Sequence, residues 1–333
     1  MSRTFKISVV IPTYQRCESV RRLLKALADQ TMPAGDYEVI VSIDGSKDAT
    51  REMVTAFEAS YLLQGLWQPN RGRAAACNTG IRAATGQLVV LLDDDMEPPP
   101  TFLEAHHKEH RDSPLSGIIG AVPIRYDRTS PPVVQFIGAK FNEHLEHLGR
   151  SNGQFKLRDF YSGNFSINRE VILELKGFDE DFKQYGNEDL ELFLRLKSKG
   201  VSVKFSQEAL AYQHYTKNFA GLARDNIAKG HTSVLLSKKH PEIFKDLKLN
   251  TYRQASRKWR LLRAGLLRLS KLSDMTPALL IKFMAWLERR HPAHLNLYYT
   301  LVLDYCYWWG VTKALPGPAR LEKLLEPLMS SQR

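Results

Sequence analysis

Apolar runs alternate with amphipathic segments over the first hundred residues of the chain. Three runs rich in β-branched residues are typical of strands buried in a parallel sheet, and they cover Lys6–Tyr14, Glu38–Asp44 and Gln87–Asp95. A weaker strand is expected at Leu62–Pro69, and the alanine-rich stretch Arg73–Ala84 predicts a helix. Strands that alternate with helices in this way predict a Rossmann-like α/β fold, with an open, mostly parallel sheet flanked by helices.

Two further helices are expected between these strands. Ser19 is expected to cap the first helix, because apolar residues recur at helical spacing after it, at Val20, Leu23, Leu24 and Leu27. Asp48 is expected to cap the second helix, which runs to about Phe57. Both helices fit the crossover connections that a parallel sheet requires.

The order of elements after residue 100 is less regular. Strands are expected at Gly117–Tyr126, Tyr161–Asn168 and Val201–Ser206. A helix is expected at Asn187–Lys199. Residues 126–152 are expected to form a loop that governs substrate choice.

The last third of the chain differs in both pattern and charge. Strand patterns stop at about Thr216, so we expect a domain boundary near residues 216–220 and a helical region after it. The net charge of the whole chain is +11, yet residues 1–215 contain 26 Lys and Arg against 28 Asp and Glu. Residues 216–333 contain 21 against 8. This asymmetry indicates an anionic partner such as phospholipid or nucleic acid, or a solvated basic face that aids solubility.

The bulk composition is that of a globular protein in a reducing compartment. Of the 333 residues, 43% are apolar and 25% are charged, which allows a large core. The cysteines Cys17, Cys77 and Cys306 are far apart and form neither a disulfide framework nor a zinc motif. Residues 1–14 lack the features of a signal peptide, so we expect a cytoplasmic protein.

Polar side chains follow three of the predicted strands. Thr13 and Tyr14 end the first strand, Asp44 ends the second, and Asp93–Asp95 follow the apolar run Leu88–Leu92. The carboxyl ends of parallel strands meet at one edge of the sheet, where open α/β sheets bind ligands. Adjacent carboxylates repel one another unless a cation offsets their charge, and such oxygen ligands suit Mg²⁺ or Mn²⁺ together with a diphosphate. The alternative for the acidic triplet is a solvated turn.

Five ordered motifs resemble glycosyltransferase family 2. They are Ile11–Arg16 (IPTYQR), Ser42–Thr50 (SIDGSKDAT), Gln68–Gly86 (QPNRGRAAACNTGIRAATG), Leu91–Pro100 (LLDDDMEPPP) and Gly186–Leu196 (GNEDLELFLRL). Each motif alone is weak, but the ordered set covers about residues 5–215. The resemblance implies a GT-A fold and direct displacement, with inversion at the anomeric carbon of a nucleotide sugar.

The resemblance also implies roles for the residues at the first two strand ends. Thr13 and Tyr14 would line the base and ribose pocket. Asp44 would accept a hydrogen bond from the base, most often uracil. The alternative for Asp44 is a turn residue before Gly45.

Two residues of the third motif fall where the family contacts the nucleotide or its phosphates. These are Asn70 and Arg73, and a guanidinium is well suited to pairing with a diphosphate. Cys77 stands where many family members carry a basic residue. The phosphate contacts could therefore fall to Arg71 or Arg73.

The acidic triplet would serve both the nucleotide and a divalent cation. Asp93 would lie near the ribose, and Asp94 is assigned to the nucleotide as well. Asp95 would bind Mn²⁺ or Mg²⁺ directly. His214 stands at a point where some related transferases complete the metal shell, although a packed histidine is the alternative.

A pair of carboxylates opens the predicted helix at 187–199. Glu188 and Asp189 would lie at the positive end of the helix dipole. An inverting transfer needs a general base for the attacking hydroxyl. The Asp of this pair usually fills that role in the family, so Asp189 would be the base and Glu188 would shape the acceptor site. The alternative is that both only satisfy amides at the helix start.

Three histidines follow the acidic triplet at helical spacing. They are His106, His107 and His110. We expect them on the exposed face of a surface helix rather than in a metal site.

The basic tail combines cations with large apolar residues. Residues 253–290 contain ten Lys and Arg against two acids, and the interleaved apolar residues are Trp259, Leu262, Leu266, Leu269, Leu279, Phe283, Trp286 and Leu287. This pattern indicates either amphipathic helices on an anionic membrane surface or a helical cap packed on the catalytic domain. The stretch Leu295–Leu315 is aromatic, and Asp304 near its centre argues against a membrane span.

These observations lead to one function. We expect an inverting hexosyltransferase that moves a sugar from a UDP-sugar to an acceptor hydroxyl, with a carbohydrate or lipid-linked glycan as acceptor in cell-envelope glycan or glycolipid synthesis. The catalytic domain would cover residues 1–215, with a nucleotide-sugar half at about 1–100 and an acceptor half at about 101–215. Residues 216–333 would form a basic helical region, and the protein would be cytoplasmic or peripheral on the inner face of the membrane. This function requires Asp44, Asp95 and Asp189 to share one cleft.

Three other functions fit less of the sequence. A polyprenyl-phosphate sugar synthase would use a related fold, but its phosphate acceptor would not need a base at Asp189. A nucleotidyltransferase would need a glycine-rich phosphate loop, which Lys6–Arg16 lacks. A non-enzymatic nucleic-acid-binding protein would account for the basic tail only, so no nucleic-acid partner is expected.

Overall fold

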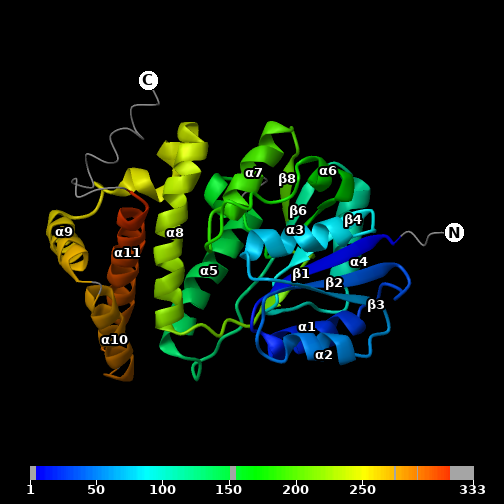
Figure 1. Cartoon of the computed structure of the whole chain (residues 1–333), viewed down its shortest axis with the longest axis horizontal. Coiled ribbons are helices and arrows are strands. Elements are labelled where there is room, and N and C mark those ends of the chain that lie inside the picture. Colours follow the sequence, from blue (N-terminus) through cyan, green and yellow to red (C-terminus); the bar gives the residue numbers. More distant parts are fainter. Residues whose placement is uncertain (1–4, 151–154, 274, 291, 316–333) are drawn as a thin grey trace. The chain divides into compact units, whose positions relative to one another are not determined.

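The chain forms two compact units, which we call the sheet unit and the helical unit (Figure 1). The computed structural model describes residues 5–150, 155–273, 275–290 and 292–315. The sheet unit comprises Met1–Asp127, Gly138–Lys183 and Glu188–Tyr215. The helical unit comprises Arg128–Ile137, Gln184–Asn187 and Thr216–Arg333.

Seven strands form the main sheet, in the order β3-β2-β1-β4-β7-β6-β8. Their bounds are β1 Ile7–Thr13, β2 Tyr37–Asp44, β3 Leu62–Gln68, β4 Leu88–Leu92, β6 Gly117–Gly120, β7 Asn164–Asn168 and β8 Val203–Ser206. Neighbours among β3, β2, β1 and β4 are parallel, β7 is antiparallel to β4 and β6, and β8 is parallel to β6. A small second sheet pairs β5 (Met96–Glu97) with β9 (Tyr212–Gln213). The predicted mostly parallel sheet is confirmed.

The helices of the sheet unit cover both faces of this sheet. Their bounds, with one 3₁₀ turn, are α1 Cys17–Ala28, α2 Thr50–Ala56, α3 Arg73–Ala83, α4 Phe102–Asp112, α5 Pro132–Arg150, η1 Leu157–Asp159, α6 Arg169–Glu174 and α7 Glu188–Ser198. The part of α5 before Gly138 belongs to the helical unit. Alternate residues of β1 enter different cores: Val9 packs in one core with Leu24 of α1, and Val10 packs in the other with Ile81 of α3. Because β1 is buried on both faces, its residues read as a continuous apolar run.

The first helix begins earlier than the sequence predicts. Ser19 lies inside α1 and does not cap it. The helix starts at Cys17, whose backbone N–H donates to Asp48 Oδ2 at 3.2 Å. The cap is therefore a carboxylate from the loop after β2, which also accepts the backbone N–H of Thr50 at the start of α2.

The segment predicted as a substrate loop is mostly helical. Residues 132–150 form α5, a helix of 19 residues. The loop prediction for 126–152 is therefore wrong. The apolar positions of α5 are spaced for a helix, and Val133, Leu145 and Leu148 are buried.

The expectation of an exposed histidine face on α4 is also wrong. His106 is fully buried, His110 is buried as well, and only His107 is partly exposed. His106 Nδ1 and His110 Nε2 lie 2.7 and 2.8 Å from Ser166 Oγ of β7. His106 Nε2 lies 2.9 Å from Asn164 Oδ1. The histidines form part of the polar core between α4 and the sheet.

The hydrogen bonds of this buried network fix the proton positions of His106 and Ser166, while His110 Nδ1 has no partner among the described residues. Asn164 Nδ2 donates to two backbone carbonyls, so its Oδ1 must accept a proton from His106 Nε2. His106 Nδ1 then accepts from the Ser166 hydroxyl, which in turn accepts from His110 Nε2. Burial lowers the pKa of His106 to about 3 and that of His110 to about 4, so both imidazoles are neutral at neutral pH.

The helical unit is built around a close pair of long helices. Its elements are α8 Phe219–Lys239, η2 Pro241–Asp246, η3 Lys248–Thr251, α9 Arg257–Leu272, α10 Met275–Arg290 and α11 Leu295–Ala314. A Cβ added at Gly230 of α8 would lie 1.9 Å from Tyr307 O, and one at Gly310 of α11 would lie 1.8 Å from Ile227 O. These glycines let the two helix backbones touch.

An ion pair between the buried Arg263 of α9 and the partly buried Asp304 of α11 joins these two helices. Arg263 Nη1 lies 2.8 Å from Asp304 Oδ2, which also accepts from Trp259 Nε1, and Lys248 Nζ lies 3.1 Å from Asp304 Oδ1. Burial alone would raise the pKa of Asp304, but Lys248, Trp259 and Arg263 outweigh it and lower that pKa. Among the described residues no helix is both long enough and apolar enough to cross a bilayer.

Candidate active site

The polar ends of β1, β2 and β4 lie next to one another, because these three strands are parallel neighbours. Thr13 is the last residue of β1 and is almost fully buried. Its hydroxyl donates to Asp94 Oδ2 at 2.7 Å, directly after β4. Tyr14, the next residue, is 47% exposed and is therefore accessible to a ligand.

Asp44 at the end of β2 organises the loop that precedes α3. Its Oδ1 accepts the backbone N–H of Arg71 at 2.9 Å and the side chain of Gln68 at 2.7 Å. Its Oδ2 accepts the backbone N–H of Gly72 at 2.9 Å, while the side-chain amide of Asn70 donates to Asp44 O at 3.1 Å. Asp44 is 4% exposed, so the expected contact to a nucleotide base would be made by a carboxylate that already accepts three protein donors.

The loop that Asp44 holds requires glycine at its last position. Gly72 has a φ of +93°, and a Cβ there would lie 2.7 Å from the carbonyl oxygen of Lys183. The next residue is Arg73, the first of α3. The Asp44 carboxylate oxygens, which accept the N–H groups of Arg71 and Gly72, therefore fix the backbone position from which the Arg73 side chain extends.

Arg73 joins the acidic triplet to the carboxylates at the start of α7. Its Nη2 lies 2.7 Å from Asp93 Oδ1, and its Nη1 lies 3.2 Å from Asp189 Oδ1 and 3.6 Å from Glu188 Oε1. The Arg73 side chain is 20% exposed and that of Glu188 only 2%. Burial acts to lower the pKa of the guanidinium, but Asp93 and then its other acidic neighbours raise it well above the usual range. Three predicted site carboxylates, Asp93, Glu188 and Asp189, thus meet at Arg73, which is itself a predicted site residue.

Ser162 is a further residue of this cluster that sequence reasoning missed. It is fully buried, its hydroxyl donates to Asp189 Oδ1, and Arg73 Nη1 lies 3.1 Å from the same hydroxyl. A Cβ on the following residue, Gly163, would lie 2.4 Å from Asp93 Oδ2. The segment before β7 therefore packs against both the acidic triplet and the proposed base. A serine before glycine at a strand start was the only sequence signal.

Asp94 and Asp95 are adjacent carboxylates, and the charge of Asp95 acts on Asp94. Burial and then the charge of Asp95 raise the pKa of Asp94 to about 7, although Thr13 opposes this shift. Asp95 is 8% exposed, and Gln213 Nε2 lies 3.2 Å from its Oδ2. A cation beside these two carboxylates would relieve their repulsion.

The backbone of His214, but not its imidazole, is hydrogen-bonded to Asp95. Its N–H donates to Asp95 O at 2.9 Å, next to the β5–β9 pair. Its imidazole Nε2 bonds instead to the carboxylate of Glu97. The His214 hydrogen bond, its charge and Arg125 together lower the pKa of Glu97 against the opposing effect of burial. Within the described ranges, no three His, Cys, Asp or Glu side chains gather as metal ligands.

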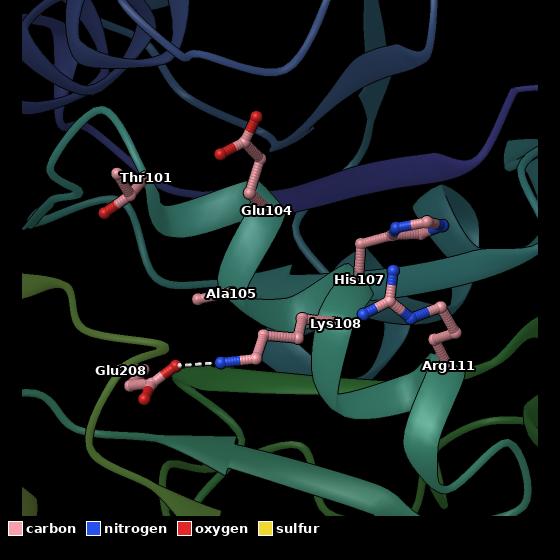
Figure 2. A pocket seen from close by; sticks show the side chains of 7 residues that line it. All are labelled: Thr101, Glu104, Ala105, His107, Lys108, Arg111 and Glu208. Carbon is pink, nitrogen blue, oxygen red and sulfur yellow. Dashed lines mark hydrogen bonds and ion pairs between the residues drawn. The ribbon is translucent and has the colours of Figure 1, made fainter.

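A separate surface hollow lies along α4. Its volume is about 600 Å³, and its walls carry Thr101, Glu104, Ala105, His107, Lys108, Arg111 and Glu208. Figure 2 shows five of these side chains on α4, with Thr101 just before the helix and Glu208 on another segment, where Lys108 Nζ lies 3.1 Å from Glu208 Oε2. None of the predicted site residues lines it. The active-site candidate is the carboxylate and arginine cluster, not this hollow.

Comparison with known proteins gives the family. Residues 8–175, which are half of the chain, match the profile of Glycosyl transferase family 2. The chain belongs to this family. Residues 144–218 also match the profile of the N-terminal domain of galactosyltransferase. The match to this family confirms the resemblance that the motifs of the chain show.

Relatives of this family-2 chain include longer proteins. Validoxylamine A glucosyltransferase of Streptomyces hygroscopicus subsp. jinggangensis is 29% identical over 269 residues, which cover 72% of this chain and 63% of that protein. Glycosyltransferase AglE of Haloferax volcanii is 37% identical over 232 residues, which cover 68% of this chain and 73% of AglE. The chain spans 39% of the chondroitin synthase of Escherichia coli, to which it is 27% identical.

A solved structure shares the fold of this family-2 chain. Mannosyltransferase PcManGT from Pyrobaculum calidifontis, in complex with GDP-Man and Mn²⁺, has a TM-score of 0.60 at 21% sequence identity. The match covers 92% of this chain and 88% of that one. The likeness confirms the GT-A fold.

Proposed function

We propose that this protein is an inverting hexosyltransferase that transfers a sugar from a UDP-sugar to an acceptor hydroxyl. The observation that carries the proposal is the Asp93–Arg73–Asp189 chain of ion pairs, with distances of 2.7 and 3.2 Å. It links a donor-side triplet after β4 with a carboxylate at the start of α7. Sugar transfer needs the groups that bind the donor and the carboxylate that acts on the acceptor to lie close to each other.

Asp189 is proposed as the general base. The acceptor hydroxyl oxygen would attack the anomeric carbon while the bond from that carbon to the diphosphate oxygen breaks. Asp189 would take the proton from the hydroxyl, and the nucleoside diphosphate would leave with the electron pair. Ser162 and Arg73 both contact Asp189 Oδ1 and would orient it, and the buried Glu188 would shape the acceptor site.

The donor would lie over the ends of β1, β2 and β4. Thr13, Tyr14 and Asp44 are proposed to border the base and ribose, with Asn70 beside them. Asp93 and Asp94 would serve the nucleotide, and Arg73 would contact the diphosphate. A TarS structure from S. aureus in complex with UDP shares the fold at a TM-score of 0.53, and PcManGT was solved with GDP-Man, so both nucleotides belong in the test.

The donor set fits a divalent cation. Asp95 offers a buried carboxylate, a cation bound to it would relieve its repulsion with the neighbouring Asp94, and diphosphate oxygens would complete a Mg²⁺ or Mn²⁺ shell. We propose Asp95 as the direct ligand and His214 as a second one, released from Glu97. The bound ion would neutralise charge on the leaving diphosphate.

The acceptor and the domain roles are part of the same proposal. Residues 1–215 would be the catalytic domain, with the donor half at about 1–100 and the acceptor half at about 101–215. Residues 216–333 would form the basic helical region. The acceptor would be a carbohydrate or a lipid-linked glycan for the cell envelope, used on the inner face of a membrane.

A panel of nucleotide sugars tests the proposal. Each UDP- and GDP-sugar is incubated with Mn²⁺ or Mg²⁺, and release of the nucleoside diphosphate is measured with and without candidate glycan acceptors. Asp95→Ala should abolish metal-dependent nucleotide binding, whereas Asp189→Asn should retain binding and lose transfer. Retained transfer to a polyprenyl phosphate by Asp189→Asn would instead identify the sugar synthase. NMR of the product anomer tests inversion.

A further inference from the structure

Helices α9 and α10 expose many large apolar side chains. Of the sixteen exposed residues of this kind in the described part of the chain, ten lie between 261 and 298. These are Leu261, Leu262, Leu269, Leu272, Met275, Leu279, Phe283, Trp286, Leu297 and Tyr298. Single exposed apolar residues are normal on a protein surface, but a contiguous group marks an interaction site.

The inward face of α9 is more polar than that of an ordinary surface helix, because two of its three buried residues, Arg263 and Ser270, are polar and only Leu267 is apolar. Its inward face carries polar groups: Arg263 bonds to Asp304, and Ser270 Oγ lies 2.5 Å from the hydroxyl of Tyr305 on α11. Its outward face carries Leu262 and Leu272, which are 56% and 85% exposed. Ordinary surface helices bury the apolar stripe and expose the polar one.

Helix α10 buries apolar residues, yet it also exposes a stripe of large apolar side chains. Met275, Leu279, Phe283 and Trp286 recur every three or four residues and are 66%, 56%, 50% and 49% exposed. The rings of Phe283 and Trp286 stack with centroids 5.7 Å apart. Regular spacing places these four side chains on one side of the helix.

The same two helices carry a dense set of cations. Eight exposed Lys and Arg lie on them, namely Arg257, Lys258, Arg260, Arg268, Lys271, Lys282, Arg289 and Arg290. The sole acid of these helices, Glu288, accepts a hydrogen bond from the Tyr299 hydroxyl at 2.6 Å. As far as the chain is described, no ion pair joins any of the eight to a carboxylate. We call these cations and the eight apolar residues from Leu261 to Trp286 the α9–α10 face.

Charge decides between the possible occupants of the α9–α10 face. A second copy bound face to face would bring eight cations against eight cations. A nucleic acid would pair with the cations but leave Leu272, Met275 and Phe283 in water. An anionic phospholipid surface satisfies both groups, because acyl chains accept the apolar side chains and phosphates pair with Lys and Arg. We infer that the α9–α10 face docks peripherally on an anionic phospholipid membrane.

Vesicle sedimentation tests the inference independently of sugar transfer. The full chain is mixed with vesicles of phosphatidylcholine alone or of phosphatidylcholine with an equal amount of phosphatidylglycerol, at low and at high salt. The protein should pellet with the anionic vesicles at low salt and be released at high salt. The variants Leu272→Gln with Phe283→Gln, and Arg268→Glu with Lys271→Glu, should each lower partitioning by about tenfold or more.

Matched substitutions on the sheet unit are the controls. Leu115→Gln removes a leucine that is 74% exposed, and Lys25→Glu with Lys197→Glu reverses two exposed cations. Both controls should pellet like the unchanged protein. Protein that stays in the supernatant at low salt, or equal loss of binding in the controls, would overturn the inference. Self-association that Leu272→Gln with Phe283→Gln abolishes, or salt-sensitive DNA binding without vesicle binding, would assign the face to those partners instead.

Discussion

Arg73 Nη1 lies 3.2 Å from Asp189 Oδ1, so the first residue of α3 is paired with the first turn of α7 across 116 positions of sequence. The same guanidinium lies 2.7 Å from Asp93. One cation therefore neutralises carboxylates from two separate parts of the proposed site. A donor diphosphate would compete with these carboxylates for Arg73.

Removal of this cation should damage both stability and catalysis. Arg73→Met leaves Asp93, Glu188 and Asp189 uncompensated in a largely buried setting, and we expect a loss of about 3 kcal/mol in the free energy of unfolding. Sugar transfer should be undetectable. Urea unfolding and the nucleotide-sugar assay measure the two effects. Arg82→Met is the control, because Arg82 is exposed and its ion pair to Glu180 is 3.7 Å long; an equal loss there would contradict the role of Arg73.

Ser162→Ala tests whether the hydroxyl positions the base. Loss of one hydrogen bond to a carboxylate should lower kcat about tenfold, since such bonds contribute about 1.5 kcal/mol. The KM for the donor should change little. Ser162→Thr, which restores a hydroxyl, should recover part of kcat if the site accommodates its methyl group. Ser198→Ala, in which the lost bond is only to a backbone carbonyl of the same helix, should have no effect. A rise in donor KM with unchanged kcat would argue against positioning.

Asp44→Asn separates two roles of the β2 carboxylate. An amide keeps one acceptor oxygen but presents N–H groups where the loop amides of Arg71 and Gly72 need a partner. If Asp44 only organises the loop, affinity for UDP and GDP should fall by the same factor, roughly tenfold for a loss of about 1.4 kcal/mol. If it also reads the base, the ratio of the two affinities should change. Calorimetry with both nucleotides measures this ratio.

The buried histidines should make the fold sensitive to acid. Their pKa values in the folded chain, about 3 for His106 and about 4 for His110, lie below the unfolded value of 6.5. The unfolded chain therefore binds more protons below pH 6.5, so the stabilising contribution is present above that pH and is lost as pH falls toward the folded values. At about pH 5 the loss should be about 2 kcal/mol per imidazole.

Urea unfolding at neutral pH and in mild acid measures this sensitivity. His110→Gln keeps an N–H donor for Ser166 but cannot ionise, so its stability should depend less steeply on pH. His107→Gln removes a histidine that is only partly buried and is the control. Identical slopes for all three proteins would show that the buried pair does not govern the acid response.

The glycines between α8 and α11 should not tolerate a side chain. Gly230→Ala and Gly310→Ala would each place a methyl group within 2 Å of a backbone carbonyl on the other helix. We expect each to destabilise the helical unit by about 1–3 kcal/mol or more, because the helices must move apart. Gly265→Ala in α9 meets nothing within 4 Å and should stabilise its helix by up to about 1 kcal/mol. Thermal melts compare the three variants; a stable Gly310→Ala protein would contradict the close packing.

The parallel half of the sheet could be predicted because its signals are local. β1, β2 and β4 are buried on both faces, so each reads as a continuous apolar run, and the polar residues at their ends follow directly in sequence. The family motifs lie at the same places. Local pattern therefore located Thr13, Asp44 and the acidic triplet next to one another.

The misjudged positions depend on partners far away in sequence. Asp48 reaches Cys17 across 31 positions, and Ser162 reaches Asp189 across 27. His106 and His110 are polar by type, yet Ser166 supplies the partner that lets α4 bury both. Neither capping preference nor helical spacing contains this information.

The basic tail shows that helical periodicity alone does not predict which side of a helix is buried. Its spacing predicted amphipathic helices, but it could not tell which stripe faces inward. Trp259 belongs to the apolar set for which a membrane surface or a packed cap is expected, and its indole N–H donates to the partly buried Asp304 at 2.9 Å. Leu261 and Leu272 lie outside the apolar set predicted from the spacing, yet they are 68% and 85% exposed.

Strand β7 and the two residues before it take part in two separate hydrogen-bond networks. Ser162, two residues before it, donates to Asp189, while Asn164 and Ser166 bond to the two imidazoles of α4. Protonation of either imidazole would disturb the same short piece of backbone that carries Ser162, the partner of the proposed base. Turnover should therefore fade as the pH falls to about 4, the pKa of His110, while the circular dichroism of the helices is still intact, and an inactive sample would recover on neutralisation without refolding.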